Sequence, residues 1–301
     1  MKRVLSLDGG GCKGIIQLAI LEQIENNLGI PIHSTFDLIV GSSVGSIIGG
    51  VLSATNLTAT KFMSSMMDAL PEIFGPRPHI PIVQPKYDRK DVVSFLREYI
   101  SPESGMKICK TKFLCSSVNI VDAKTHFFKS WEDKDGDLNF IEALNRSYAA
   151  PYFFGAMVDK KSNSVWLDGG TGNQNCPLIE TRIELARQGW TNERVHILSL
   201  GAGQTDAGVP FNSAKFYGTI LQALFYTRPA DGGLARIQNV GSQVELFKSE
   251  VIAHPNISFQ RLDILNMAKK INKLDGAKYR HVYKRIGEDL ANKVDYKLFK
   301  E

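Results

Sequence analysis

The sequence predicts an α/β fold in which a mainly parallel central sheet carries helices on both faces. Short apolar runs, typical of buried strands, recur along the first two-thirds of the 301-residue chain. The first two runs flank a segment with helical apolar spacing, and strands joined through a helix form a parallel βαβ unit. Three glycine-rich turns directly follow predicted strands, where α/β sheets place their functional groups.

The first fifty residues predict strand, glycine loop, helix, strand, tight turn and helix. Val4–Leu7 is a short apolar run that ends at an aspartate, as expected of a buried strand. Residues 14–28 have apolar side chains at helical spacing, and Gly29 stands where a helix C-cap belongs. Phe36–Val40 forms the second strand, which Gly41 interrupts before another apolar helical run.

The remaining elements are predicted in the same way. Helices are expected near residues 59–70 and 91–100, with a proline-punctuated loop from Pro71 to Pro85 between them. Four further strands are expected at Phe113–Ile120, Thr125–Trp131, Ser164–Leu167 and Val195–Leu200. No linker divides the chain, so we expect one domain over residues 1–301, with a motif-bearing core at about 3–203 and a helical C-terminal part at about 213–301.

Composition and charge exclude several classes of protein. Hydrophobic residues make up 43% and charged residues 22%, which is typical of a globular protein and excludes disorder. Residues 266–301 hold ten Lys/Arg and five Asp/Glu, so the whole net charge of +5 lies on this segment and nucleic acid is not an expected partner. The four cysteines lack metal-ligand spacing, and neither a signal peptide nor a membrane span is predicted, so a cytoplasmic location is expected.

The first glycine turn, Asp8-Gly-Gly-Gly-Cys-Lys-Gly14, opens the first helix. Successive backbone N–H groups and the helix N-terminus favour an anion there, either a phosphate or a developing oxyanion. The spacing Gly9-x-Gly11-x-x-Gly14 also matches a dinucleotide fingerprint, which requires an acidic residue at the end of the second strand. Asp37 lies at the start of that strand instead. A nucleotide-triphosphate loop is excluded because Lys13 is followed by glycine.

The second turn, Gly41-Ser-Ser-Val-Gly45, matches Gly-x-Ser-x-Gly between a strand and a helix. In this setting the sharp turn exposes the serine, which makes Ser43 a candidate nucleophile. The alternative is a serine in a close-packed glycine bend.

A serine nucleophile needs a base, and the third turn supplies a candidate. Asp168 follows an apolar strand and precedes two glycines, whereas its rival Asp231 lacks a strand and is expected to cap a helix. His126 and His196 lie inside predicted strands and are expected to be structural. No cluster of carboxylates or histidines suggests a metal site.

These three turns, in this order, resemble the motifs of patatin-like phospholipases. Two further segments, Ala149–Phe154 and Ser199–Gly203, are also similar. The resemblance implies a three-layer patatin-like fold and a dyad in which Ser43 is the nucleophile and Asp168 the base. It also implies an oxyanion hole at the N–H groups of Gly10 and Gly11, and no metal or cofactor. The other motif positions are Gly9, Lys13, Gly14, Gly41, Gly45, Gly169 and Gly170.

For substrate and partners, the resemblance implies a serine lipid acyl hydrolase that contacts membranes peripherally and cleaves phospholipids or lysophospholipids. Bacterial relatives include effectors that a cyclic nucleotide of an antiviral signalling system switches on, so a cyclic-nucleotide activator is a further hypothesis. Two alternatives remain: a nucleotide-binding module that uses the N-terminal glycine loop, and a catalytically inactive lipid-binding protein. The sequence does not indicate an oligomeric state.

Three features have two interpretations each. Lys13 either orients the glycine loop or helps to hold the anion, or else it is a solvated lysine at a helix start. The methionines at 63, 66 and 67 belong either to the core or to an acyl path. The C-terminal segment has apolar residues at helical spacing between lysines and arginines, so it either packs on the domain or lies on anionic lipid.

Overall fold

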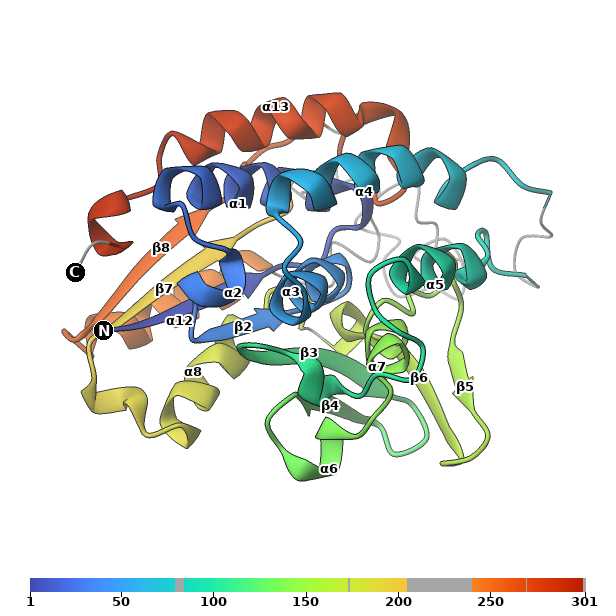
Figure 1. The fold of residues 1–301 in the computed structure, drawn as a ribbon, viewed down its shortest axis with the longest axis horizontal. Coiled ribbons are helices and arrows are strands. Elements are labelled where there is room, and N and C mark those ends of the chain that lie inside the picture. The colour runs from blue at the N-terminus through green and yellow to red at the C-terminus, as the bar shows by residue number, and fades with distance from the viewer. Residues whose placement is uncertain (79–83, 173, 205–239, 269, 300–301) are drawn as a thin grey trace, which may run out of the picture.

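A single mixed sheet runs through the middle of the molecule (Figure 1). The computed structural model describes residues 1–78, 84–172, 174–204, 240–268 and 270–299. Eight strands belong to this sheet: β1 (Lys2–Leu7), β2 (Leu38–Gly41), β3 (Lys112–Asn119), β4 (Lys124–Lys129), β5 (Met157–Asp159), β6 (Ser164–Asp168), β7 (Val195–Leu200) and β8 (Ile257–Leu262).

The strand order is β5-β6-β3-β2-β1-β7-β8, and β4 pairs with β3 beside this path. The five neighbouring strands β3, β2, β1, β7 and β8 are parallel to one another. The strands β4, β5 and β6 form antiparallel pairs. Leu7 is opposite Gly41 in β2 and Leu200 in β7, so these three strands end at the same edge of the sheet. The turns that follow them therefore meet at this edge, which we call the carboxyl edge.

Helices cover both faces of the sheet, which confirms the predicted three-layer α/β fold. Figure 1 shows α1, α4 and α13 stacked on one side of the sheet, with α8 on the other. Among the described residues, the helices of at least eight residues are α1 (Gly14–Leu28), α3 (Val44–Ala54), α4 (Ala59–Ile73), α5 (Arg89–Arg97), α7 (Phe140–Ser147), α8 (Leu178–Arg187), α12 (Val240–Ile252) and α13 (Arg280–Ala291). One apolar core lies under α1, α3 and α4, and a second lies between the sheet, α8 and α12.

Two predicted elements need correction. The segment after residue 213 is not purely helical, because β8 adds a parallel edge strand beside β7. Only Ile257 and Leu262, the two ends of β8, are fully buried, so its sequence lacks the apolar run of a central strand. The helix predicted to stop before Pro71 continues to Ile73. A proline in the last turn of a helix disturbs few backbone hydrogen bonds. Asp231 lies outside the described residues.

The basic C-terminal helix α13 packs on α1 and does not stand free. Tyr283 and Leu290 of α13 are buried. A Cβ on Gly287 would lie 2.5 Å from the Ile16 carbonyl oxygen and 2.6 Å from the Ala19 side chain, so only glycine allows this close approach. The described residues contain no helix that is both long and apolar enough to cross a bilayer.

Candidate active site

The turn between β2 and α3 holds Ser43 in a strained backbone conformation. Ser43 has φ 52° and ψ −123°, a region that residues other than glycine rarely adopt. A Cβ on Gly41 would lie 2.5 Å from the Gly45 carbonyl oxygen, and a Cβ on Gly45 would lie 2.4 Å from the Leu7 carbonyl oxygen. The close backbone contacts therefore require glycine on both sides of the serine. Because α3 begins directly after Ser43, the positive end of its dipole lies at this turn.

Asp168, the last residue of β6, lies beside the Ser43 hydroxyl. The N–H of Gly170 donates a hydrogen bond to Asp168 Oδ1 at 2.7 Å. Burial raises the pKa of Asp168 from 3.8 to about 6, although the Ser43 hydroxyl and the Gly170 N–H favour the carboxylate and oppose this shift. A carboxylate with such a pKa is a stronger base than an ordinary aspartate, and it is still ionised at neutral pH.

The chain at the end of α7 holds both members of this pair. The backbone N–H of Ser43 donates to Ser147 Oγ at 3.3 Å, and the N–H of Asp168 donates to the Ala149 carbonyl at 2.9 Å. Asp168 also lies opposite Ser117 in the antiparallel pairing of β3 with β6. Ser147 was not singled out from the sequence, because no glycine motif marks it.

Gly10 and Gly11 line the same pocket as Ser43 and Asp168. Neither backbone N–H has a hydrogen-bond acceptor among the residues that the structure describes. Gly11 has φ 58°, a left-handed conformation that favours glycine. Two unpaired amides beside a serine hydroxyl can stabilise an oxyanion that forms on a carbonyl attacked by that hydroxyl.

The amides on either side of these two glycines are already bonded. The N–H of Gly9 donates to the Asn175 carbonyl at 2.8 Å, and the N–H of Cys12 donates to the Leu274 carbonyl at 2.7 Å. A Cβ on Gly9 would lie 2.4 Å from Asn175 Oδ1, so the segment after Asp168 packs tightly on the loop. These contacts fix both ends of the glycine loop and leave its middle open to the pocket.

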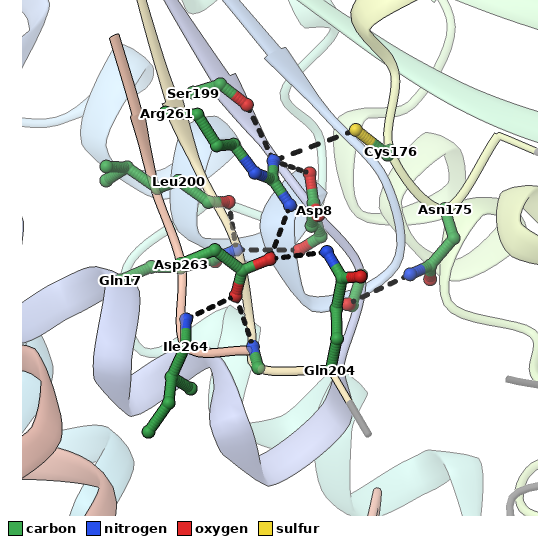
Figure 2. Close-up of polar contacts among 12 residues, drawn as sticks. Asp8, Gln17, Asn175, Cys176, Ser199, Leu200, Gln204, Arg261, Asp263 and Ile264 are labelled. Atoms are coloured by element: carbon green, nitrogen blue, oxygen red, sulfur yellow. Dashed lines mark hydrogen bonds and ion pairs between the residues drawn. The ribbon is translucent and has the colours of Figure 1, made fainter. Parts of the chain in front are cut away.

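A buried ion-pair network lies behind the loop (Figure 2). The Arg261 guanidinium bonds both carboxylate oxygens of Asp8, at 2.9 and 2.5 Å, and also Oδ2 of Asp263 at 2.8 Å. The other oxygen of Asp263 accepts the N–H of Gly203 at 2.9 Å. Arg261 also donates to Ser199 Oγ at 2.7 Å, and so joins β8, β7 and the start of the glycine loop. Arg261 and Asp263 escaped sequence analysis because they lie far along the chain from every glycine motif.

Lys13 also ties the loop to the C-terminal part of the chain. Its Nζ donates to the Gly203 carbonyl at 3.2 Å and to Asn272 Oδ1 at 2.5 Å. Lys13 is buried, and burial lowers its pKa to about 8. The interpretation of Lys13 as a solvated lysine is therefore wrong, and its side chain is absent from the described lining of the pocket.

The wall of the pocket is mostly apolar. Its side chains come from α3, α4, α5 and the segment after α7: Val44, Ile47, Met66, Leu70, Ile73, Phe74, Val92, Phe95, Tyr148, Ala150, Pro151, Phe153 and Phe154. Of the three methionines in α4, Met66 lines the pocket, whereas Met63 and Met67 are buried core residues. Such a wall suits a long aliphatic chain.

The lining of this pocket includes none of the histidines and cysteines that the structure describes. His196 is buried in β7 and bonds Ser258 Oγ at 3.0 Å, and His126 bonds Asp122 at 2.7 Å. Burial raises the pKa of the Cys12 and Cys176 thiols well above the ordinary range, so both stay protonated. Among the described residues, no group of three or more His, Cys, Asp or Glu side chains could hold a metal ion.

Fold and site together define an α/β protein with a serine on a sharp strand-to-helix turn, a buried aspartate beside it and a glycine loop facing both. Residues 5–181 match the family described as patatin-like phospholipase. This match covers more than half of the chain, which therefore belongs to the patatin-like phospholipase family.

Curated relatives are similar over 59–68% of the chain. A cGAMP-activated phospholipase of Escherichia coli is 31% identical over 66% of this chain and 61% of its own length. A cGAMP-activated phospholipase of Vibrio cholerae is 28% identical over 59% of this chain and 56% of its own. Patatin-T5 of Solanum tuberosum is 32% identical over 68% of this chain and 61% of its own. The chain thus spans less than two-thirds of the length of each relative.

Proposed function

We propose that this protein is a serine lipid acyl hydrolase that cleaves fatty-acyl esters of phospholipids or lysophospholipids through a Ser43–Asp168 dyad. The observation that supports this proposal most is that the Ser43 hydroxyl lies beside the buried Asp168 carboxylate and favours its ionised form. Both side chains lie in one pocket with the backbone amides of Gly10 and Gly11, which have no acceptor among the described residues. This arrangement brings together a nucleophile, its base and an oxyanion site.

Acylation begins when Ser43 Oγ attacks the ester carbonyl carbon and Asp168 accepts the hydroxyl proton. The carbonyl oxygen becomes an oxyanion, which the N–H groups of Gly10 and Gly11 stabilise. One such donor contributes roughly 3–4 kcal/mol in other enzymes. The tetrahedral intermediate then collapses, the bond from the carbonyl carbon to the alcohol oxygen breaks, and Asp168 returns the proton to the leaving alcohol. A fatty-acyl ester of Ser43 remains.

Deacylation repeats these steps with water as the nucleophile. Asp168 takes a proton from the water, the hydroxide attacks the acyl carbonyl, and the same two amides stabilise the second oxyanion. The bond between the acyl carbon and Ser43 Oγ breaks, and Oγ recovers a proton from Asp168. The fatty acid leaves and the dyad is restored. Each step uses only groups of this chain and water.

The pocket supports a lipid substrate. Met66 and Leu70 of α4 and Val92 and Phe95 of α5 line it, and these apolar side chains suit an acyl chain. A lipid that enters from a bilayer requires peripheral contact of the protein with the membrane. We place this activity in the cytoplasm.

A cyclic nucleotide as activator is the second part of the proposal. The relatives from Escherichia coli and Vibrio cholerae are cGAMP-activated phospholipases, and each covers more than half of this chain. We infer that a cyclic nucleotide raises the activity of this protein as well, in a role in antiviral defence. Full activity of the purified protein without any nucleotide would contradict this part alone.

The nucleotide-binding alternative finds less support. A ribose-binding carboxylate is required at the end of the second strand, near the glycine loop. Asp37 instead precedes β2, where its carboxylate accepts the backbone N–H of Arg3 at 2.9 Å and lies 3.5 Å from Lys2 Nζ. These residues mark the edge of the sheet opposite to the loop. A catalytically inactive lipid-binding protein would not require a buried carboxylate beside the Ser43 hydroxyl.

The direct test is fatty-acid release from mixed phospholipid vesicles, with and without a panel of cyclic nucleotides. A soluble short-chain ester serves as a second substrate. We expect Ser43→Ala and Asp168→Asn to abolish release from both. Ser42→Ala is the matched control, because Ser42 is buried next to the nucleophile and its hydroxyl bonds only to Ser116 among the described residues. Release that survives Ser43→Ala would overturn the proposed nucleophile.

A further inference from the structure

One turn of the sheet and a neighbouring short strand expose aliphatic side chains to solvent. Ile120 and Val121 lie in the turn between β3 and β4, and their exposed fractions are 50% and 58%. Val158 of β5 is 59% exposed. The N–H of Ile120 donates to the Val165 carbonyl at 2.9 Å, and Val158 is opposite Val165 in the pairing of β5 with β6. The three aliphatic residues therefore belong to one continuous surface.

This surface lies on the same edge of the sheet as the pocket. Cys115 of β3 is opposite Gly41 at the end of β2, and β3 continues from there to Asn119. Four residues of strand extend about 13 Å, so the turn projects beyond the Ser43 turn along the strand direction. In Figure 1 the turn between β3 and β4 and the turn between β5 and β6 both lie at the lower right, the side toward which the β2 arrow points.

The strand β6 connects this surface to the catalytic site. It starts at Ser164, beside the turn that follows β5, and ends at Asp168. The five residues of β6 span about 13 Å from first to last. A bilayer surface that touches the turns therefore lies closer to the pocket than the length of one phospholipid molecule. The exposed aliphatic groups are thus placed where the substrate of the proposed reaction would arrive.

The charges around these turns are mainly positive on the outside. Lys124, Lys160 and Lys161 are exposed. Two carboxylates lie nearby: Asp122, whose side chain is 37% exposed, bonds His126 at 2.7 Å, and Asp159, whose side chain is 12% exposed, bonds Arg146 at 3.0 Å. Lysines around aliphatic side chains complement a bilayer, which presents anionic headgroups above hydrocarbon.

We propose that Ile120, Val121 and Val158, with the lysines at 124, 160 and 161, form a docking surface for an anionic lipid bilayer. This inference rests on the proposed lipid acyl hydrolase function and names the surface through which the enzyme reaches its substrate. The aliphatic side chains enter the headgroup region and leave water, and the lysines pair with lipid phosphates. The apolar face of the basic helix α13 cannot contact the bilayer, because it packs on α1.

The test measures binding to sedimented vesicles of phosphatidylcholine, with or without phosphatidylglycerol. All proteins carry Ser43→Ala, so no lipid is consumed. Replacing Ile120, Val121 and Val158 together with serine should lower the partition coefficient about 10- to 100-fold. Replacing the three lysines with glutamine should lower it roughly 10- to 100-fold on anionic vesicles and little on phosphatidylcholine alone.

Ile252→Ser is the matched control for the serine triple variant. Ile252 is 84% exposed at the end of α12. It precedes the start of β8 and thus lies at the opposite edge of the sheet. This substitution should leave vesicle binding unchanged. Equal binding of all variants, or no binding by the parent protein, would overturn the proposal. So would a serine variant that loses self-association while keeping its vesicle binding, because the surface would then contact a second copy.

The same substitutions in the Ser43-containing enzyme separate this inference from the proposed function. Turnover of a soluble ester should stay at the wild-type level in the serine and glutamine variants, because none of these residues lines the pocket. Hydrolysis of vesicle lipid should fall together with binding. Turnover of the soluble ester by Ser43→Ala tests the dyad independently of vesicle binding. Its loss supports the dyad, and its survival contradicts it.

Discussion

Replacement of Asp168 by asparagine is expected to abolish activity and to stabilise the fold at neutral pH. Burial raises the pKa of this carboxyl from 3.8 to about 6. Because the folded-state pKa lies above the unfolded value, the stability contributed by the protonated carboxyl is complete below about pH 3.8 and is lost as the pH rises through about 6. A difference of about 2 pKa units corresponds to about 3 kcal/mol at neutral pH. Asparagine is neutral at every pH and avoids this loss.

Urea unfolding of wild type and Asp168→Asn at about pH 7.5 and about pH 4.5 measures this effect. The free energy of unfolding of Asp168→Asn minus that of wild type should be about 2 kcal/mol larger at the higher pH than at the lower. Asp159→Asn is a control without pH dependence in this range, because hydrogen bonds from Ser162 and Lys161 lower the pKa of Asp159, so the stability from its ionised form is lost only below about pH 3.8 and the variant should differ from wild type nearly equally at both pH values. The reasoning is refuted if the difference between Asp168→Asn and wild type is the same at both pH values.

Three further predictions concern the same site. Because Asp168 must be ionised to accept a proton, kcat/KM for a soluble ester should fall about tenfold per pH unit below about 6, and a flat profile down to about pH 5 would argue against this base. Gly11→Ala should lower kcat at least 100-fold, because its Cβ would lie 2.1 Å from the Leu274 carbonyl oxygen and one oxyanion donor would be displaced. Gly29→Ala is its control: Gly29 has φ 68° but open space around its Cβ, so activity should remain. Arg261→Met should lower the free energy of unfolding by about 3–5 kcal/mol, because it leaves two buried carboxylates without their cation, and unchanged urea unfolding would contradict that.

The fold class and the glycine turns were predictable because their signals are local. A strand followed by a glycine turn and a helix leaves its pattern in a dozen adjacent residues, as around Ser43. Asp168 was predicted as the base because it directly follows an apolar strand and precedes two glycines, but that strand, β6, is antiparallel to β3, so its position beside Ser43 did not follow from the rule for parallel strands. The family resemblance then joined the motifs into one site.

The contacts that hold the site together were not predictable from local pattern. Arg261 meets Asp8 across 253 residues of chain, and no spacing rule links the two. β8 has a mixed polar and apolar sequence because it is an edge strand, so it carries no continuous apolar run. Ser147 contributes a single hydroxyl to the backbone of Ser43, which only the folded geometry reveals.

The measurement that tests the central claim most directly is covalent trapping with a fluorophosphonate, followed by mass spectrometry of the digested protein. The probe phosphonylates a serine only where a base removes its proton and an oxyanion site stabilises the transition state. We predict one adduct, on the peptide that contains Ser43, with labelling strongly slowed in Asp168→Asn and absent in Ser43→Ala. An adduct on another residue, or rapid labelling without Asp168, would contradict the Ser43–Asp168 dyad.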